Sequence, residues 1–319
     1  MELPFLSNLL SSTRQRAGWI AVCVNSSGLY FSRVKHSAGK PCVTSCAFYP
    51  LENSLPAALE KLRKDQRIAG SQLITLLEPG EYQMLLAEAP NVPPEEFKTA
   101  VRWRIKDSLN YRIDDATVDV LRIPASKKGG GDRPLSLYAI AAPNDTIKKR
   151  IALFEKARLD LKVIDIPEMA QRNIAALFEE GESGLALLSF DEHGGLLTIT
   201  SGGELYLARR LEITSGQLQD SNENLRLQYL ERVELELHRS LDYFGRQFSY
   251  VPVRRMLVSA PERLGLVQQL ASSIELPVEQ IDLSRVLDIS AAPELADSEY
   301  ASRMLMALGA SLRQERRAS

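Results

Sequence analysis

The chain has 319 residues, of which 45% are hydrophobic and 25% charged, a composition typical of a globular protein with room for about two domains. Its 39 basic and 41 acidic residues nearly cancel, which excludes an overall positive field that would attract nucleic acid. No run approaches the roughly 20 apolar residues of a membrane-spanning helix, and residues 1–16 lack the pattern of a signal peptide. Three cysteines without a second Cys/His cluster predict free thiols and no metal site.

The first half of the chain alternates short apolar runs with turn residues. Three strands and then a helix are predicted, at residues 18–24, 29–35, 42–50 and 54–66. Leu55, Leu59 and Leu62 recur at the spacing of one helix face and would be buried. Two further strands, 72–78 and 82–88, are predicted to be joined by Pro-Gly-Glu, a turn.

Residues 97–109 form a predicted helix that would pack on a sheet made by residues 117–123 and 135–141. Its apolar stripe consists of Phe97, Val101, Ile105 and Leu109. Arg104 falls within this stripe and Trp103 lies beyond its edge, which reverses the usual arrangement of a buried aromatic and an exposed cation. The helix therefore predicts either an internal ion pair or a surface that receives a partner.

The second half repeats the opening order of elements. Three strands again form a predicted meander, and a long helix follows, with apolar residues at every third or fourth position from Leu230 to Phe248. Such a duplication implies two similar lobes with a cleft between them. The predicted units are a first lobe in two parts, an inserted α+β subdomain, a second lobe, and a C-terminal helix with a basic tail: residues 17–86 and 144–180, 87–143, 181–298, and 299–319.

Four separated phrases carry a resemblance to a known family: LEPGEYQMLLAEAPNVPPEEFKTAVRWRIKDSLNYRIDDATVD, KVIDIPEMAQRNIA, GELYLARRLEI and ELHRSLDYFGRQF. Their order and spacing resemble the PilM-type proteins of type IV pilus assembly, in the FtsA-like branch of the actin-like ATPase superfamily. The first phrase resembles the MshI subset, which serves mannose-sensitive haemagglutinin (MSHA) pili. The resemblance implies an α/β fold of two lobes, a duplicated ribonuclease H-like unit with an FtsA/PilM-type subdomain inserted in the first. It also implies that the C-terminal helix packs on the first lobe or on the seam.

The same resemblance implies a cytoplasmic protein that is associated with the inner membrane through a partner. Such proteins belong to the pilus assembly platform and bind the cytoplasmic N-terminal peptide of a bitopic PilN-type protein, with the pilus motor ATPase as a further candidate partner. The insertion would border the partner groove, so Trp103 and Arg104 are the predicted partner-binding residues. The alternative is structural, with Trp103 packed at an edge and Arg104 in an internal ion pair. The candidate acids for this ion pair with Arg104 are Asp114, Asp115 and Asp119.

An actin-like nucleotide site needs one turn from each lobe, whose backbone N–H groups bind phosphate. In PilM-type proteins each of these turns begins with Asp-Ile-Gly. Here the first turn has Val24 or Asn25 where the Asp is expected, although Ser26, Ser27 and Gly28 keep groups that suit phosphate. The first turn alone therefore leaves nucleotide binding open.

The second turn departs further, with Ser189, Phe190 and Asp191 in place of Asp-Ile-Gly. The adenosine motif has Pro261 where glycines are expected, and proline removes a donor and adds bulk. One element matches, the helix that lines the nucleoside pocket: Glu236, Arg239 and Ser240. Packing and capping would also explain these three. We therefore predict no enzyme, no catalytic residue and no cofactor; the alternative is an actin-like protein that binds ATP with Mg²⁺ and whose nucleotide state gates partner binding.

Overall fold

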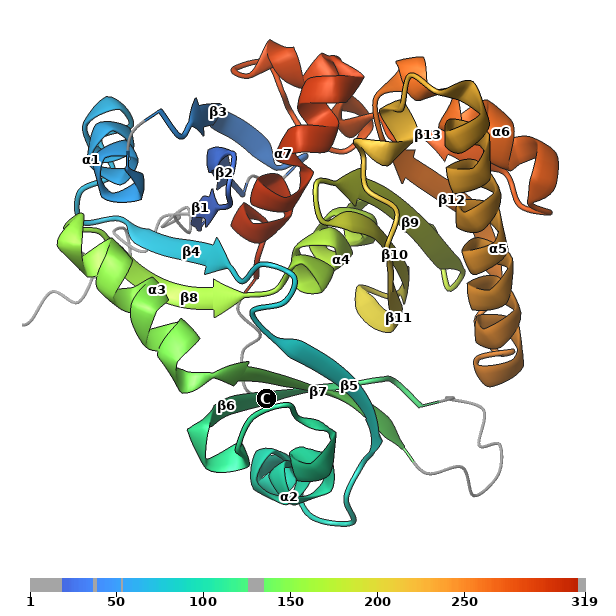
Figure 1. The fold of residues 1–319 in the computed structure, drawn as a ribbon, viewed down its shortest axis with the longest axis horizontal. Helices are drawn as coiled ribbons and strands as arrows, with labels where there is room; N and C mark the ends of the chain where they lie inside the picture. Colours follow the sequence, from blue (N-terminus) through green and yellow to red (C-terminus); the bar gives the residue numbers. More distant parts are fainter. Residues whose placement is uncertain (1–18, 37–38, 53, 126–134, 315–319) are drawn as a thin grey trace, which may run out of the picture.

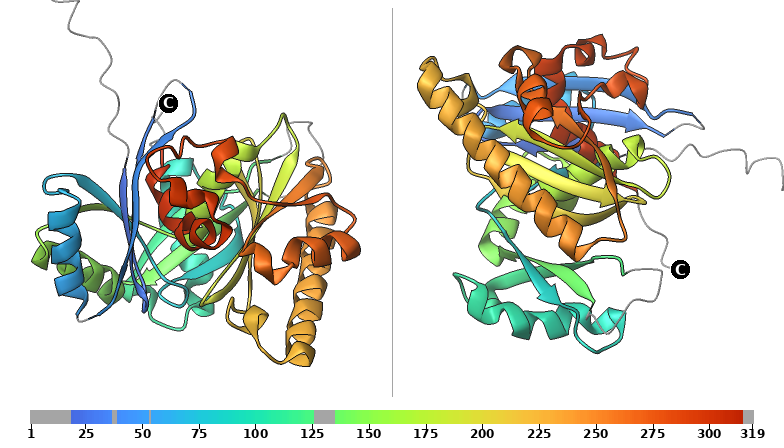
Figure 2. Two further views of the ribbon diagram at one scale, coloured as in Figure 1. Left: turned by 90° about the horizontal axis from the view of Figure 1, so that it is seen from above. Right: turned by 90° about the vertical axis from the view of Figure 1, so that its right-hand side faces the viewer.

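The computed structural model describes residues 19–36, 39–52, 54–125 and 135–314, so most of the predicted basic tail lies outside it. Two five-stranded sheets stand side by side, and a three-stranded sheet lies at one end of the molecule (Figure 1). Seen from above, helices α4 (Pro167–Phe178) and α7 (Ser298–Ser311) fill the space between the two large sheets (Figure 2). None of the described helices is long and apolar enough to cross a bilayer.

The first lobe is a sheet in the order β3-β2-β1-β4-β8, covered on one face by two helices. Its elements are β1 (Ile20–Val24), β2 (Gly28–Lys35), β3 (Cys42–Pro50), α1 (Leu55–Asp65), β4 (Gln72–Leu76), α3 (Asn144–Lys156) and β8 (Asp160–Asp165). Strands β1 to β3 pair antiparallel, whereas β1, β4 and β8 pair parallel. Because side chains alternate along a strand, Ile20, Val22 and Val24 join the core with α1 and α3. Ala21 and Cys23 face α4 and α7.

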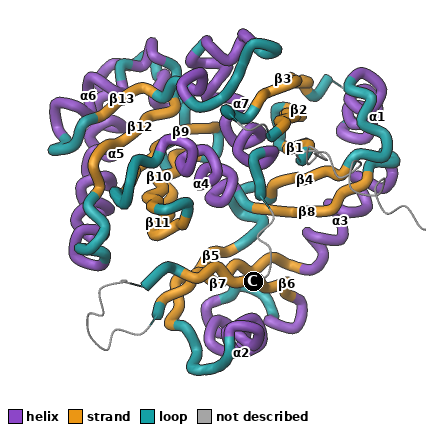
Figure 3. The backbone as a smooth tube through the Cα atoms, turned by 180° about the vertical axis from the view of Figure 1, so that it is seen from behind, coloured by secondary structure: helices purple, strands orange, loops and turns teal. Residues whose placement is uncertain are grey.

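The second lobe repeats this topology, in the order β11-β10-β9-β12-β13. Its elements are β9 (Gly184–Asp191), β10 (Gly194–Ser201), β11 (Glu204–Leu211), α5 (Glu223–Gln247), β12 (Val253–Ser259), α6 (Leu266–Ser273) and β13 (Val278–Gln280). Helices α5 and α6 cover the outer face of this sheet (Figure 3), and Leu230, Val233 and Leu237 of the predicted α5 stripe are buried there. This repeat confirms the predicted duplication into two lobes.

The insertion is a third sheet, in the order β5-β7-β6, with one helix on its face. Its elements are β5 (Gln83–Glu88), α2 (Phe97–Ile105), β6 (Ala116–Arg122) and β7 (Ser136–Pro143). The predicted stripe is confirmed, since Phe97, Val101 and Ile105 of α2 are buried on β7. The two predicted strands β4 and β5 are present but do not pair with each other: β4 pairs with β1 and β8, and β5 pairs with β7. The inserted sheet therefore already includes Gln83, whereas the sequence placed the start of the insertion at residue 87.

The C-terminal helix α7 lies in the seam between the lobes, as predicted. Its N-cap Asp297 accepts a hydrogen bond from the backbone N–H of Tyr300 at 2.8 Å, which starts the helix. The predicted apolar stripe is buried: Met304, Leu305, Leu308 and Leu312. The hydroxyl of Ser32 on β2 donates to the carbonyl oxygen of Ala307 at 2.8 Å, so this helix is tied to the first sheet by a buried hydrogen bond as well as by apolar packing.

Candidate functional site

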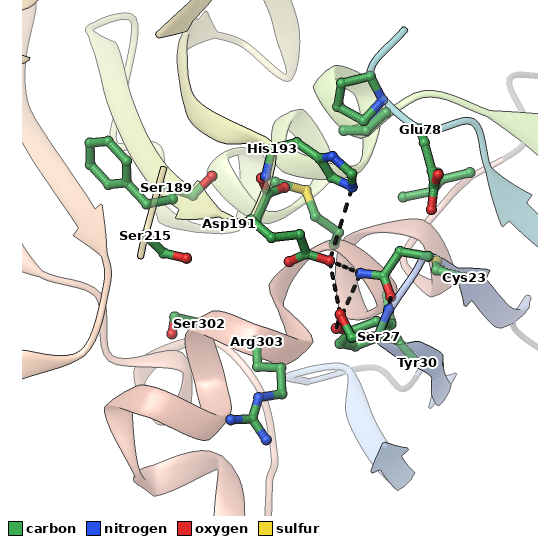
Figure 4. Close-up of a pocket in the computed structure, with 18 of the residues that line it drawn as sticks. Cys23, Ser27, Tyr30, Glu78, Ser189, Asp191, His193, Ser215, Ser302 and Arg303 are labelled. Carbon is green, nitrogen blue, oxygen red and sulfur yellow. Dashed lines mark hydrogen bonds and ion pairs between the residues drawn. The ribbon is translucent and has the colours of Figure 1, made fainter. Parts of the chain in front are cut away.

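A cavity of about 400 Å³ lies between the lobes, where the turn after β1 and the turn after β9 face each other (Figure 4). These are the two turns that the sequence places at a nucleotide phosphate. Further parts of the wall come from the segment after β4 and from α7, which supplies Glu299, Ser302, Arg303, Met306 and Ala307. A cleft between two lobes is the usual place for a small-molecule site, so we take this cavity as the candidate site.

The backbone of the first turn is stabilised by the side chain of Asn25, a residue of that turn. Asn25 Oδ1 accepts hydrogen bonds from the backbone N–H groups of Ser27 and Gly28, at 3.0 and 3.1 Å. Gly28 is required by packing, because a Cβ there would lie 2.1 Å from the carbonyl oxygen of Tyr49. These two N–H donors are therefore not free to bind a phosphate oxygen.

The second turn is also stabilised by a hydrogen bond between its own residues. Asp191 Oδ1 accepts from the backbone N–H of His193 at 2.7 Å, and burial raises the pKa of the Asp191 carboxyl. The hydroxyl of Ser189, which stands where the family has Asp, donates to Gln171 Oε1 at 2.6 Å. The family's metal- or water-positioning carboxylate thus has no equivalent at Ser189.

The walls of the cavity are rich in acid. Four carboxylates and two basic side chains line it: Glu78, Asp191, Glu192 and Glu299, with His193 and Arg303. Burial, followed by repulsion from the Glu81 carboxylate, raises the pKa of Glu78. The Arg303 guanidinium lies over the Phe48 ring at 5.5 Å and is 3.7 Å from Glu299. These carboxylates oppose the negative charges of a triphosphate. Among the described residues, no group of three His, Cys, Asp or Glu side chains could hold a metal ion.

The residues predicted to line a nucleoside pocket lie on α5, outside the lining of this cavity. Glu236 Oε1 accepts from Arg239 Nη1 at 2.8 Å, and the buried Ser240 hydroxyl donates to the Glu236 carbonyl oxygen at 2.5 Å. These contacts agree with the packing and capping alternative. In the first turn, Ser27 lines the cavity but Ser26 and Gly28 do not. A nucleotide role for any of these residues stays a prediction.

The two predicted partner-binding residues lie on the exposed side of α2. Trp103 is 69% exposed, the largest value among the large apolar side chains that the structure describes. Arg104 Nη1 donates to the carbonyl oxygen of Glu88 at 3.1 Å and lies 4.0 Å from the Glu88 carboxylate. The insertion therefore presents an indole and a guanidinium side by side in sequence and open to solvent.

The acid beside Arg104 is not one of the three aspartates expected from the sequence. Arg102, two positions earlier on α2, donates to the carbonyl oxygens of Ile113 and Ala116 at 2.6 and 2.9 Å. Residues two apart point to nearly opposite sides of a helix. Because Arg102 faces the segment that contains those aspartates, Arg104 is turned toward the end of β5.

Sequence reasoning missed a buried polar junction where three parts of the molecule meet. The Tyr82 hydroxyl, just before β5, donates to Glu168 Oε2 of α4 at 2.5 Å, and Arg210 Nε of β11 donates to Glu168 Oε1 at 3.1 Å. Burial, and then the Glu168 carboxylate, raise the pKa of Tyr82 well above its usual value, so the phenol stays protonated and donates. Each residue belongs to a different one of the first three quoted phrases, which was the available signal.

No protein-family model and no curated protein matches this sequence. Among solved structures, a chain of the PilM–PilN type IV pilus biogenesis complex is similar, with a TM-score of 0.73 and 18% identity over 93% of this chain and 98% of that one. A Bacteroides thetaiotaomicron protein with an actin-like ATPase fold and unknown function gives 0.45 and 13%, over 88% and 96%. The cytoplasmic domain of EpsL, an inner-membrane component of the type II secretion system of Vibrio cholerae, gives 0.44 and 11%, over 81% and 97%. The likeness to the PilM–PilN chain confirms the sequence resemblance at the level of the fold.

Proposed function

We propose that this chain is a non-catalytic cytoplasmic adaptor of the type IV pilus inner-membrane assembly platform, in the branch that serves MSHA pili. It binds the cytoplasmic N-terminal peptide of a PilN-type membrane protein, which holds it at the inner membrane, and the pilus motor ATPase is a further partner. One observation carries the proposal, the fold shared along nearly the whole chain with a protein of the PilM–PilN complex. The first quoted phrase, which resembles MshI-type proteins, supports the MSHA branch.

The inserted subdomain offers a surface for such a peptide. Trp103 is open to solvent on α2, and an exposed indole gains burial when a partner covers it. The neighbouring Arg104 uses one donor on the Glu88 carbonyl, and a guanidinium has five N–H groups. The others are suited to peptide carbonyls or to an acidic side chain.

Trp103→Ala and Arg104→Ala should each weaken binding of a PilN-type N-terminal peptide by about 1–3 kcal/mol, the range of interface hot spots. Both side chains are substantially exposed, so the fold should be little affected. Isothermal titration calorimetry with a synthetic peptide measures the change. Leu235→Ala and Arg246→Ala are the matched controls, since they remove an exposed apolar and an exposed basic side chain from α5 of the second lobe. Unchanged affinity in both test variants would mean that the peptide binds at another surface of the protein.

The non-catalytic part of the proposal rests on the cavity between the lobes. Its first turn uses the Ser27 and Gly28 N–H donors internally, and its walls carry four carboxylates. The alternative function is an actin-like ATP-binding protein whose nucleotide state gates partner binding. The position and size of the cavity favour that alternative, whereas its donors and charges oppose it.

We expect no ATP turnover above that of buffer, and no saturable binding of a fluorescent ATP analogue below about 1 mM, with or without Mg²⁺. The reason is that the backbone N–H groups of Ser27, Gly28 and His193 are already bonded within their turns, and that neither turn has the Asp that begins the family's phosphate motif. A titration of the analogue and a phosphate-release assay measure the two quantities. Mg²⁺-dependent turnover that disappears in Glu236→Ala would contradict this expectation, and tight binding without turnover would favour the gating alternative.

A further inference from the structure

One carboxylate joins the two lobes across the mouth of the cavity. Glu192 Oε1, in the turn after β9, accepts a hydrogen bond from the Asn25 side-chain amide and another from the Ser27 hydroxyl at 3.1 Å (Figure 4). Asn25 and Glu192 are 167 residues apart in the sequence. The bridge therefore fixes one lobe to the other, and it is made by the two turns that the fold would otherwise use for phosphate.

The orientation of Asn25 is set within its own turn. Its side-chain oxygen accepts from the Ser27 and Gly28 backbone, which leaves the amide nitrogen to face Glu192. An aspartate here would fold the turn equally well, but it would have no N–H to donate and would repel Glu192. The two turns are thus complementary, with an amide donor at Asn25 in the first and an acidic acceptor at Glu192, directly after the residues that replace Asp-Ile-Gly, in the second.

We infer that Glu192 acts as an internal anion in the place of a nucleotide phosphate and latches the two lobes together without a ligand. A phosphate in this cleft would accept hydrogen bonds from the first turn, and the Glu192 carboxylate accepts them there from the side chains of Asn25 and Ser27. Apart from this bridge, the lobes are also joined by α4 and α7, which pack between the two large sheets. The latch is made by the turns of the two lobes and not by the surface of α2. Its test is therefore independent of the test of the proposed peptide partner.

The test exchanges donor and acceptor across the bridge. Asn25→Asp keeps the turn but opposes two carboxylates, so hydrogen–deuterium exchange should become faster by roughly 3- to 30-fold in both turns, residues 25–28 and 191–194. The double variant Asn25→Asp/Glu192→Gln restores one donor and one acceptor with reversed polarity. Its exchange in both turns should return to within about twofold of the original protein, as expected for directly coupled residues.

Two further variants complete the design. Glu192→Ala removes the acceptor and should accelerate exchange in residues 25–28, a segment to which Glu192 does not belong. Glu223→Gln is the control, because it alters an exposed carboxylate that is bonded within α5 and should leave both turns unchanged. The latch is overturned by unchanged exchange of residues 191–194 in Asn25→Asp, by unchanged exchange of residues 25–28 in Glu192→Ala, or by a double variant that shows no recovery.

Discussion

Gly309→Ala is expected to lower the free energy of unfolding by about 2–3 kcal/mol, as an overpacked core substitution does. Gly309 lies where α7 crosses α4, and a methyl group on its Cα would lie 2.1 Å from the carbonyl oxygen of Ala170. The next nearest atoms also belong to the Ala170 backbone, so no side chain can move aside to relieve the clash. The two helices would have to separate, which would open the core that joins the lobes.

Gly245→Ala is the matched control for this prediction. A methyl group at Gly245 of α5 would meet no atom within 4 Å, so only the better helix propensity of alanine should act. That propensity should raise the free energy of unfolding by roughly 0.5–1 kcal/mol. Urea denaturation followed by circular dichroism measures both variants. If Gly309→Ala stabilised the protein as Gly245→Ala does, the close approach of α7 to α4 would be wrong.

Much of the fold was predictable because local patterns agree with tertiary packing. In β1 the alternation of side chains serves a core on each face, and in α5 the apolar spacing matches the helix period. The neighbour of strand β5 was not predictable, because Pro-Gly-Glu signals a turn but does not say which strands pair across it. Its partner β7 follows only after α2 and β6, and no short-range pattern encodes that pairing.

The site was predictable only in part, for a related reason. The loss of Asp-Ile-Gly from both turns is visible in the sequence, and it correctly directed attention to the cavity. The meeting of Asn25 with Glu192 depends on how the lobes close, which no spacing in the sequence reports. Likewise, the periodicity placed Arg104 in the buried stripe, but its partner Glu88 lies at the end of β5, whose position beside α2 no spacing in the sequence reports.

The junction of Tyr82, Glu168 and Arg210 contains a buried carboxylate whose charge would be left unpaired if Arg210 were removed. Glu168 is only 3% exposed, and its carboxylate is 2.9 Å from Arg210 Nη2. The pair joins α4 in the seam to β11 of the second lobe, and Tyr82 adds the entry to the inserted sheet. A buried carboxylate that loses its cation stays out of water without an opposite charge beside it. The resulting loss of stability is larger than the loss caused by breaking an exposed ion pair.

Arg210→Met should lower the free energy of unfolding by about 3 kcal/mol, the low end for breaking a buried ion pair, because the Arg210 side chain is itself 29% exposed. Arg239→Met is the matched control, since the Arg239–Glu236 distance of 2.8 Å is nearly the same but the arginine is largely exposed. Surface pairs contribute little, so this variant should change stability by less than about 0.5 kcal/mol. Urea denaturation at neutral pH measures both. Equal effects would mean that burial of Glu168 adds nothing to the cost, and that the junction is no more than a surface contact between the three parts of the molecule.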